Sequence, residues 1–272
     1  MRLFIATLSL AVSGCYSLSH VQQFTTEATE ILVQGFHLEP TFYQVCQQRQ
    51  RRDLLQQGKL TPKFREGCNV SLQADSATVQ ILETLTRYLA GLHQLAASGR
   101  SGSSLAPLGN ALQTLPLAEG QADVVASYQE LAQLSLTGLT ERSRRKKAQD
   151  FIERAEKPLQ TLLNAYQFML NESLAEQIRR QQYTQRGYSR ELLDSAHSFI
   201  EKKLVIEEYM DQMLEYEAQL QSIQQYVDAL NIISEGHTAL YQQRTQLHQQ
   251  EVIGSLLFYT NYLRQMQLLS KF

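Results

Sequence analysis

The sequence predicts an all-α fold: an antiparallel helical bundle with a long, coiled-coil-like helical hairpin in its C-terminal half. Helix-breaking residues are scarce, because the 272 residues include only 13 glycines and 5 prolines. Leucine, alanine and glutamine, which are good helix formers, are abundant. Apolar residues recur every three or four positions over long stretches, which is typical of helices with one buried face. No alternating segment is long enough to require a sheet.

The N-terminal part of the chain is expected to hold two helices and a loop. A helix is expected over residues 21–33, and Pro40 ends helical geometry after it, because the residue before a proline is pushed into an extended conformation. Thr41 is a suitable N-cap for a second helix over residues 42–57, which a glycine would end. Residues 59–76 contain proline, glycine and asparagine and are expected to form a loop.

The middle of the chain predicts short helices joined by loops, which implies antiparallel neighbours. The first begins at Ser76, and its buried face is marked by Val79, Leu82, Leu85, Leu89, Leu92 and Ala96. A flexible loop is expected over residues 98–104 and a second helix over residues 105–115. A third helix should run from about Gln121 to about residue 137.

The C-terminal half predicts the long hairpin. Its first arm should run from Thr140 to a break at Gly187, with a kink or short interruption near Pro158. Ser189 is then expected to cap the second arm, which continues to about Gln250.

Apolar residues at seven-residue steps form a coiled-coil-like seam along the second arm. Its members are Phe199, Ile206, Met213, Leu220, Val227 and Tyr241, with Tyr209, Tyr216, Ile223 and Leu230 three residues after their partners. Ser234 fills the missing position, and His237 also falls on the seam, where a hydrogen-bonded core histidine is expected rather than a ligand or base. The seam over residues 199–241 also offers a surface for homo-oligomers. The tail, residues 252–272, is expected to dock on the bundle; the alternative is an exposed helix that binds a partner or a membrane surface.

The first fifteen residues, MRLFIATLSLAVSGC, carry a targeting pattern. Arg2 supplies a positive charge, and the apolar run that follows has about ten residues, too few for a bilayer core that needs roughly twenty. Small residues then stand directly before Cys15. This pattern resembles the lipobox signal of bacterial lipoproteins. The alternative is an ordinary secretory peptide in which Cys15 has no role.

The resemblance implies that residues 1–14 are removed as a signal peptide and that Cys15 becomes an acylated, palmitate-bearing N-terminus. Tyr16 and Ser17 follow the cysteine instead of the aspartate that retains lipoproteins in the inner membrane. The resemblance therefore implies an outer-membrane anchor with the body in the periplasm. Several acyl chains on one residue give a firm anchor, whereas a single chain binds marginally.

With Cys15 lipidated, Cys46 and Cys68 remain as a pair in a compartment where disulfides persist. A bridge between them would close a loop whose entropy is worth about 3 kcal/mol; two buried, reduced cysteines are the alternative. The interpretation divides the chain into a signal peptide (1–14), a lipidated tether with a disulfide-tied helical segment (15–75), a short-helix bundle (76–139) and the long hairpin with its C-terminal helix (140–272).

Charge gives little reason to expect nucleic acid as a partner, because the formal net charge is only −2. The densest charge cluster comprises Arg142, Arg144, Arg145, Lys146 and Lys147. These cations fall in the first turns of a predicted helix, where the macrodipole disfavours them. They are therefore candidates for contact with anionic lipid headgroups or an acidic partner, while a solvated helix face is the simpler explanation.

The sequence lacks the phosphate-binding loop, HExxH and GxSxG motifs of common enzyme classes. The histidines are scattered, at His20, His37, His93, His197, His237 and His248. Acids at helical spacing, namely Glu207, Glu208, Glu215 and Glu217, lack the Glu-x-x-His motif of carboxylate metal sites and are expected to be solvated. We therefore expect no catalytic residues, cofactor or metal site.

These observations favour a non-enzymatic, membrane-anchored periplasmic lipoprotein that acts by binding. An envelope protein partner is expected, and an inhibitor or immunity-type protein is one version of this role. Two alternatives remain at this point: a carrier of a small apolar ligand or lipid in the bundle core, and an enzyme without a recognisable motif.

Overall fold

The computed structural model describes residues 18–35, 37–58, 66–97, 122–133 and 144–269. Every regular element within these ranges is helical, which confirms the predicted all-α bundle. The α-helices are α1 (Ser19–Gly35), α2 (Phe42–Gln57), α3 (Asn69–Ala96), α4 (Ala122–Gln133), α5 (Arg144–Phe168), α6 (Glu176–Ser195), α7 (Phe199–Gln242) and α8 (Gln250–Leu269). Shorter helical turns cover Glu66–Cys68 (η1), Met169–Ala175 (η3) and Arg244–Gln246 (η4). The loop and the helix expected over 98–115 lie outside the described residues.

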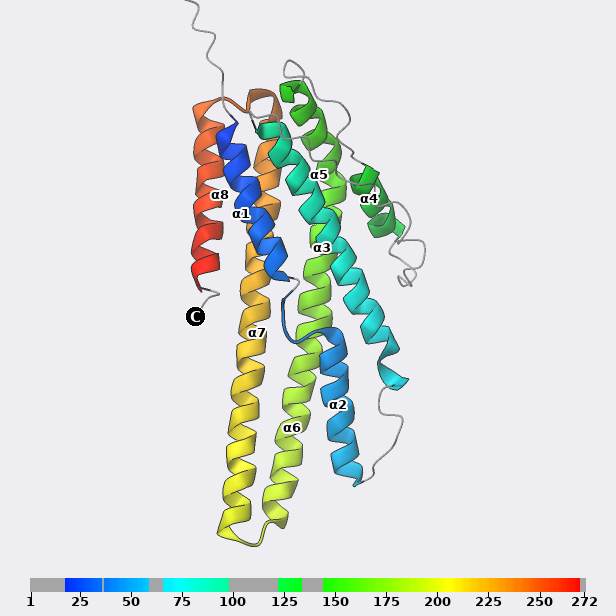
Figure 1. Cartoon of the computed structure of the whole chain (residues 1–272). Coiled ribbons are helices and arrows are strands. Elements are labelled where there is room, and N and C mark those ends of the chain that lie inside the picture. Colours follow the sequence, from blue (N-terminus) through cyan, green and yellow to red (C-terminus); the bar gives the residue numbers. More distant parts are fainter. Residues whose placement is uncertain (1–17, 36, 59–65, 98–121, 134–143, 270–272) are drawn as a thin grey trace, which may run out of the picture.

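The helices form an elongated bundle (Figure 1). α5, η3 and α6 follow one another as one long rod, and α7 runs antiparallel to it. α1, α3 and α8 pack around one half of this pair, and α4 lies outside, against α5 and α3. In the other half α2 lies against α6, and the turn between α6 and α7 forms the far end of the molecule. The start of α1 and the α6–α7 turn are therefore at opposite ends.

One connected hydrophobic core holds the helices together. Phe24 of α1, Leu85 of α3, Leu159 of α5, Leu230 of α7 and Leu256 of α8 all belong to it and are at most 1% exposed. Full burial of side chains of this size stabilises the fold by about 1.5–3 kcal/mol each. No helix among the described residues combines the length and apolar character needed to cross a bilayer.

The boundaries of α2 follow the predicted signals, whereas α3 begins earlier than predicted. Thr41 forms a capping box with Gln44, and Gly58 ends α2 in the left-handed conformation. α3 starts at Asn69, so the segment before Ser76 is helical rather than a loop. The breaking residues of this segment, a proline and a glycine, precede Asn69, and nothing after it opposes helix formation.

The predicted break at Gly187 is wrong. α6 continues through this exposed glycine and ends at Ser195. Ser189, the predicted N-cap, is a buried residue inside α6 whose hydroxyl accepts a hydrogen bond from Gln185. A glycine inside a helix costs only about 1 kcal/mol, which the packing of α6 against α7 offsets.

Ser198 is the N-cap of α7. Its hydroxyl accepts the N–H of Glu201, and the Glu201 carboxylate accepts the N–H groups of Ser198 and His197 at 2.9 and 2.8 Å. These backbone hydrogen bonds hold the pKa of Glu201 below its usual value. The capping box, which satisfies backbone donors reciprocally, places the hairpin turn here rather than at Gly187.

The interruption expected at Pro158 lies elsewhere. Pro158 is buried inside α5, which continues to Phe168. The chain departs from α-helical geometry in the π-helix η3, from Met169 to Ala175, where Leu170 and Leu174 are buried. A π-helical stretch changes the register between the two parts of a rod. It therefore sets which faces of α5 and α6 meet α7.

The predicted tail docks on the bundle, since α8 packs against α1 and α7. Val252, Leu256, Thr260 and Leu263 form its buried face. The polar Thr260 satisfies its hydroxyl by donating to the Leu256 carbonyl at 2.7 Å. Docking therefore uses an ordinary amphipathic helix face.

Candidate functional site

The predicted lipidation site, Cys15, and the first member of the basic run, Arg142, lie outside the described residues. The rest of the run, Arg144, Arg145, Lys146 and Lys147, occupies the first turn of α5. Lys146 is exposed and Lys147 is half-buried. α5 begins at the end of the bundle where α1 also begins (Figure 1). The described part of the basic run and the start of α1 thus lie at the same end of the bundle.

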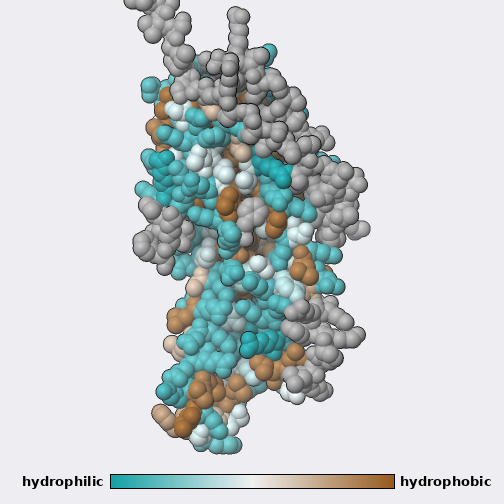
Figure 2. Space-filling model, in the orientation of Figure 1, coloured by the Kyte–Doolittle hydropathy of each residue, from teal (hydrophilic) through white to brown (hydrophobic). Residues whose placement is uncertain are grey.

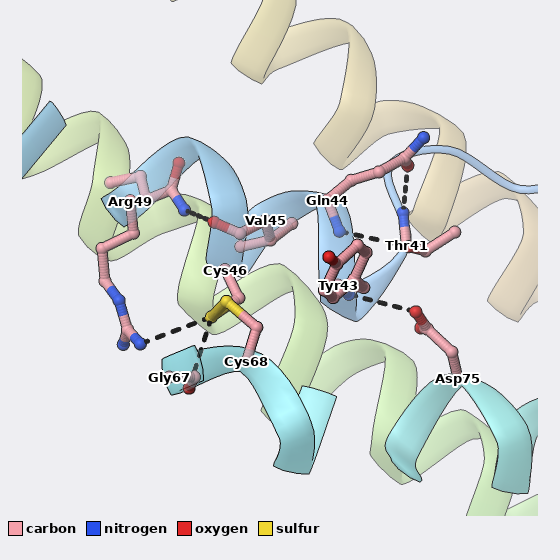
Figure 3. Close-up of a disulfide and its surroundings, with 10 residues drawn as sticks. Thr41, Tyr43, Gln44, Val45, Cys46, Arg49, Gly67, Cys68 and Asp75 are labelled. Atoms are coloured by element: carbon pink, nitrogen blue, oxygen red, sulfur yellow. Dashed lines mark hydrogen bonds between the residues drawn. A yellow bond between two sulfur atoms is a disulfide. The ribbon is translucent and has the colours of Figure 1, made fainter. Parts of the chain in front are cut away.

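Cys46 and Cys68 are joined as predicted, with their sulfur atoms 2.06 Å apart (Figure 3). Both side chains are almost completely buried, at 2% and 0% exposure. The disulfide connects the middle of α2 to the residue that precedes α3. It therefore ties α2, which has few buried residues of its own, to the body of the bundle.

The start of α2 is held by a second link to α3. The N–H groups of Phe42 and Tyr43 donate to the two carboxylate oxygens of Asp75 at 2.8 and 3.1 Å (Figure 3). A carboxylate at a helix N-terminus satisfies free backbone donors and is favoured by the helix dipole. Asp75 therefore fixes the position of α2 as well as capping it.

Arg52 fastens the other end of α2 to the hairpin. Its guanidinium is only 7% exposed and donates to the Gln181 carbonyl at 3.0 Å, to the Gln181 side chain at 3.1 Å and to the Tyr216 hydroxyl at 2.6 Å. Gln181 in turn donates to the Val45 carbonyl at 2.5 Å. This network joins α2, α6 and α7 through neutral acceptors, which satisfies the buried cation without a carboxylate partner.

An exposed apolar surface lies on α7 next to the hairpin turn. Phe199, Ile206, Met210 and Leu214 are 81%, 49%, 53% and 60% exposed. Their spacing places them on one face of the helix, and we call this face the hairpin stripe. Figure 2 shows apolar side chains gathered at this end of the molecule. Large apolar side chains grouped at one exposed place are typical of an interaction surface.

The same face of α7 becomes polar toward the body of the bundle. Continuing the helical spacing from the hairpin stripe leads to Glu217, Gln221, Gln224 and Asp228, all of which are exposed. The apolar character is thus restricted to the projecting end of the helix. It is a local feature and not a general property of the outer face of α7.

Two members of the predicted seam belong to this exposed region. From Met213 to Leu240, seam-side residues of α7 are largely buried against α1, α5 and α6. Phe199 and Ile206, predicted as seam residues, are instead exposed. The cause is visible in Figure 1, where α1, α3 and α8 end before they reach the part of α7 next to the turn. An apolar repeat is buried only where other helices cover it.

The interior contains a polar relay that crosses three helices. His237 is fully buried, its Nδ1 lies 2.6 Å from Glu156 Oε2, and its Nε2 lies 2.5 Å from the Tyr88 hydroxyl. Thr238 donates to the other Glu156 oxygen at 3.0 Å. The predicted hydrogen-bonded core role of His237 is confirmed. His237 and Tyr88 are both buried, whereas the Glu156 side chain is 18% exposed, and the relay joins α3, α5 and α7.

The environment of the relay shifts two pKa values. Burial acts to raise the pKa of Glu156, but the hydrogen bond and charge of His237, with Thr238 and Gln160, lower it below its usual value. Burial raises the pKa of Tyr88 well above its usual value, and the charge of Glu156 adds to this effect. Both shifts favour an ionised Glu156 beside a neutral Tyr88.

The other candidate metal or catalytic groups do not come together. Glu207, Glu208, Glu215 and Glu217 are exposed on α7. Across the ranges that the structure describes, no group of three or more His, Cys, Asp or Glu side chains is arranged to hold a metal ion. Comparisons with protein-family models, curated proteins and solved structures found no match.

Two groups central to this arrangement were not singled out from the sequence. Arg52 stands in a polar, glutamine-rich helix, and Glu156 stands beside a lysine, so both appear solvated in the sequence. A signal for Glu156 does exist, because Ser234 and His237 place polar side chains on an otherwise apolar seam. Such a pair predicts polar partners on the facing helix.

Proposed function

We propose that this chain is an outer-membrane-anchored lipoprotein of the bacterial cell envelope that binds a protein partner through the hairpin stripe. The observation that carries the proposal is that, along α7, the exposed large apolar residues all lie in the part next to the hairpin turn, from Phe199 to Leu214. Interfaces depend on a few large apolar or aromatic anchors that become fully desolvated. Phe199, Met210 and Leu214 are suited to enter an apolar groove on the partner.

The geometry of the chain supports an anchored role. The lipobox-like sequence ends at Cys15, three residues before the described part of the chain begins at residue 18, and α1 starts at the end opposite the hairpin turn. α7 has 44 residues and spans about 66 Å. A lipid on Cys15 would therefore hold one end at a membrane and direct the hairpin stripe away from it. The basic first turn of α5 lies at the membrane-facing end, where anionic headgroups would favour it.

Site-specific photo-crosslinking in intact cells tests the proposed interface. A benzophenone amino acid at Phe199 should give one adduct with a protein partner. The same group at Phe168, a matched aromatic that is 60% exposed on the body, should not. Equal crosslinking from both positions, or the absence of any adduct from Phe199, would refute the interface. An adduct with the mass of two copies of this chain would show self-association instead and would also refute the proposed partner.

The anchor is tested separately. Substitution of Cys15→Ser should abolish fatty-acid labelling of the protein and release it from the membrane fraction, while Cys46→Ser should leave labelling intact. Labelling that persists in the Cys15→Ser variant would overturn the lipoprotein assignment without affecting the hairpin result.

A further inference from the structure

A row of carboxylates runs beside the hairpin stripe on α7. The stripe residues Ile206, Met210 and Leu214 follow one another at steps of four residues, and each is followed directly by an exposed acid. These acids, which we call the acidic row, are Glu207, Asp211 and Glu215. Residues four apart on a helix lie one above the other, so the acidic row is parallel to the stripe along the helix.

The charge of the acidic row is only partly balanced by cations of the same chain. No lysine or arginine follows Lys203 within α7. Lys203 Nζ lies 3.5 Å from Glu207 Oε1, whereas Asp211 and Glu215 form no ion pair within the described part of the chain. Arg51 of α2 lines the same surface groove as Glu215 without pairing with it. Because Lys203 and Glu207 are both more than half exposed, their pair contributes little and a partner cation can replace it.

This charge narrows the choice of occupant for the stripe. A bilayer surface with anionic headgroups would be repelled by the acidic row. Two copies of the chain that met antiparallel through this face would bring their acidic rows together, which is also repulsive. A protein segment that carries lysine or arginine beside its apolar residues would complement the stripe and the acidic row at the same time.

Backbone hydrogen bonding favours a helical occupant over an extended one. An extended segment would leave its N–H and C=O groups unpaired on this surface, because α7 uses its own backbone groups within the helix. A helix satisfies its own backbone, and side chains four apart on it repeat every 6 Å or so, as the acids of the row do. The stripe is about 22 Å long from Phe199 to Leu214, so a helix of about 15 residues covers it.

We infer that the hairpin stripe and the acidic row together bind a basic amphipathic helix of the partner protein. Met210 and Leu214 enter the grooves between the side-chain ridges of its apolar face. Lysine or arginine side chains three or four residues apart along one edge of that face pair with the acidic row. Such pairs at the rim of an interface determine selectivity and association rate more than affinity, and salt weakens them. The inference rests on the proposed function, because it names the chemistry of the partner that the same surface binds.

Binding of designed peptides to the full chain tests the inference. The protein is kept in an uncharged detergent, detergent alone is the reference, and fluorescence anisotropy follows a labelled peptide. The probes are helical peptides of about 15 residues that share one leucine face and carry lysine, glutamine or glutamate along its edges. The lysine peptide should bind about tenfold more tightly than the glutamine peptide, as expected from a few rim ion pairs, and the glutamate peptide should bind most weakly. Raising the salt concentration to about 0.5 M should remove most of this difference.

Charge-neutralising variants locate the binding surface. Substitution of the acidic row by Glu207→Gln, Asp211→Asn and Glu215→Gln should weaken binding of the lysine peptide by about tenfold and leave the glutamine peptide unchanged. The matched control neutralises exposed acids elsewhere on the helical hairpin and changes the net charge equally: Glu172→Gln, Asp228→Asn and Glu235→Gln. It should leave both peptides unchanged. All variants replace exposed residues and should keep the circular dichroism spectrum of the parent.

The stripe variant Met210→Gln with Leu214→Gln should weaken both peptides, because both use the apolar face. The inference is overturned if the lysine peptide binds no more tightly than the glutamine peptide, if the control weakens binding as much as the acidic-row variant, or if the stripe variant binds like the parent. Co-sedimentation of the Cys15→Ser variant with phosphatidylcholine vesicles, lost on adding the stripe substitutions, would identify a bilayer as the occupant and also overturn it.

The crosslinking experiment at Phe199 separates the two proposals. Mass spectrometry of the adduct should place the crosslink in a partner segment with lysine or arginine at steps of three or four residues. An adduct in a segment without such cations would overturn the basic helix and leave the hairpin interface in place. The absence of any adduct would refute the interface, and the basic helix with it, whatever the peptides show.

Discussion

Replacing His237 by leucine is expected to lower the free energy of unfolding by about 3–5 kcal/mol. The substitution leaves the buried Tyr88 hydroxyl without its partner at 2.5 Å, which costs about 1–3 kcal/mol. It also removes the 2.6 Å hydrogen bond to Glu156, and a hydrogen bond to a charged group contributes about 1.5–3 kcal/mol. Glu156 retains Thr238 as a donor, so part of its hydrogen bonding survives. The leucine side chain fills most of the space, which keeps the expected cost within this range.

A double-mutant cycle separates the relay from simple packing. Tyr88→Phe removes the hydroxyl but keeps the ring that stacks on Phe151 at a centroid distance of 5.1 Å. Tyr88→Phe alone should cost about 1–2 kcal/mol, because the imidazole loses a partner. The double variant Tyr88→Phe with His237→Leu should lose at least about 1 kcal/mol less free energy of unfolding than the sum of the two single losses. The reason is that, without the Tyr88 hydroxyl, the leucine leaves no buried hydroxyl without a hydrogen-bond partner.

Urea denaturation of the full chain, followed by circular dichroism at constant pH, measures these differences. His37→Leu is the control, since His37 is exposed, and it should change stability by less than about 0.5 kcal/mol. The relay argument fails if His237→Leu costs under about 1 kcal/mol, or if the two substitutions add within about 0.5 kcal/mol.

Three further predictions follow from other contacts. Because the folded-state pKa of Glu156 is lowered, its ionised form stabilises the protein above the carboxyl's ordinary pKa, and this contribution is lost as the pH falls through the folded-state pKa. The free energy of unfolding, measured by urea titration, should therefore fall less steeply below about pH 5 in the Glu156→Gln variant than in the parent. Identical dependence on pH in the two proteins would contradict the lowered pKa of Glu156. Gly236→Ala should cost about 1–3 kcal/mol by calorimetry, because a Cβ there would lie 2.4 Å from the Phe24 ring. Gly254→Ala, which meets nothing within 4 Å, should be neutral or slightly stabilising, and an equal loss at both glycines would exclude a steric cause. Removing the disulfide with Cys46→Ser and Cys68→Ser should lower the free energy of unfolding by about 3 kcal/mol, because the bridged residues are 22 positions apart. Reductant should lower the stability of the parent by a similar amount and leave the double variant unaffected. A parent whose stability does not change with reductant would refute this contribution.

Features decided by neighbouring residues were predictable from the sequence. Thr41 and Gly58 bound α2 because a side-chain cap and a left-handed glycine act over only a few residues. The pairing of Cys46 with Cys68 followed from the number of cysteines, once Cys15 was assigned to a lipid. Such signals do not depend on how the helices are packed.

Features decided by packing were not predictable in the same way. The sequence predicts the hairpin turn at Gly187, but α6 continues through this residue, and α7 begins at the Ser198–Glu201 capping box instead. The partners of Arg52 lie more than a hundred residues away in the sequence, at Gln181 and Tyr216. A single sequence shows that a polar residue is present, but it does not show whether an acceptor far away in the chain forms the hydrogen bonds that the residue needs when it is buried.

The exposed and the buried parts of α7 show why sequence alone did not locate the interface. One apolar repeat runs from Phe199 to Tyr241, and its two ends have the same pattern. Where α1, α5 and α6 cover it, the repeat forms core and is already occupied within the chain, so neither a partner nor a second copy can use it. Next to the hairpin turn, Phe199 and Ile206 remain open, and Met210 and Leu214 extend the same face. The end of α1, α3 and α8 before this part of the hairpin, rather than its composition, therefore converts a core pattern into a candidate binding surface.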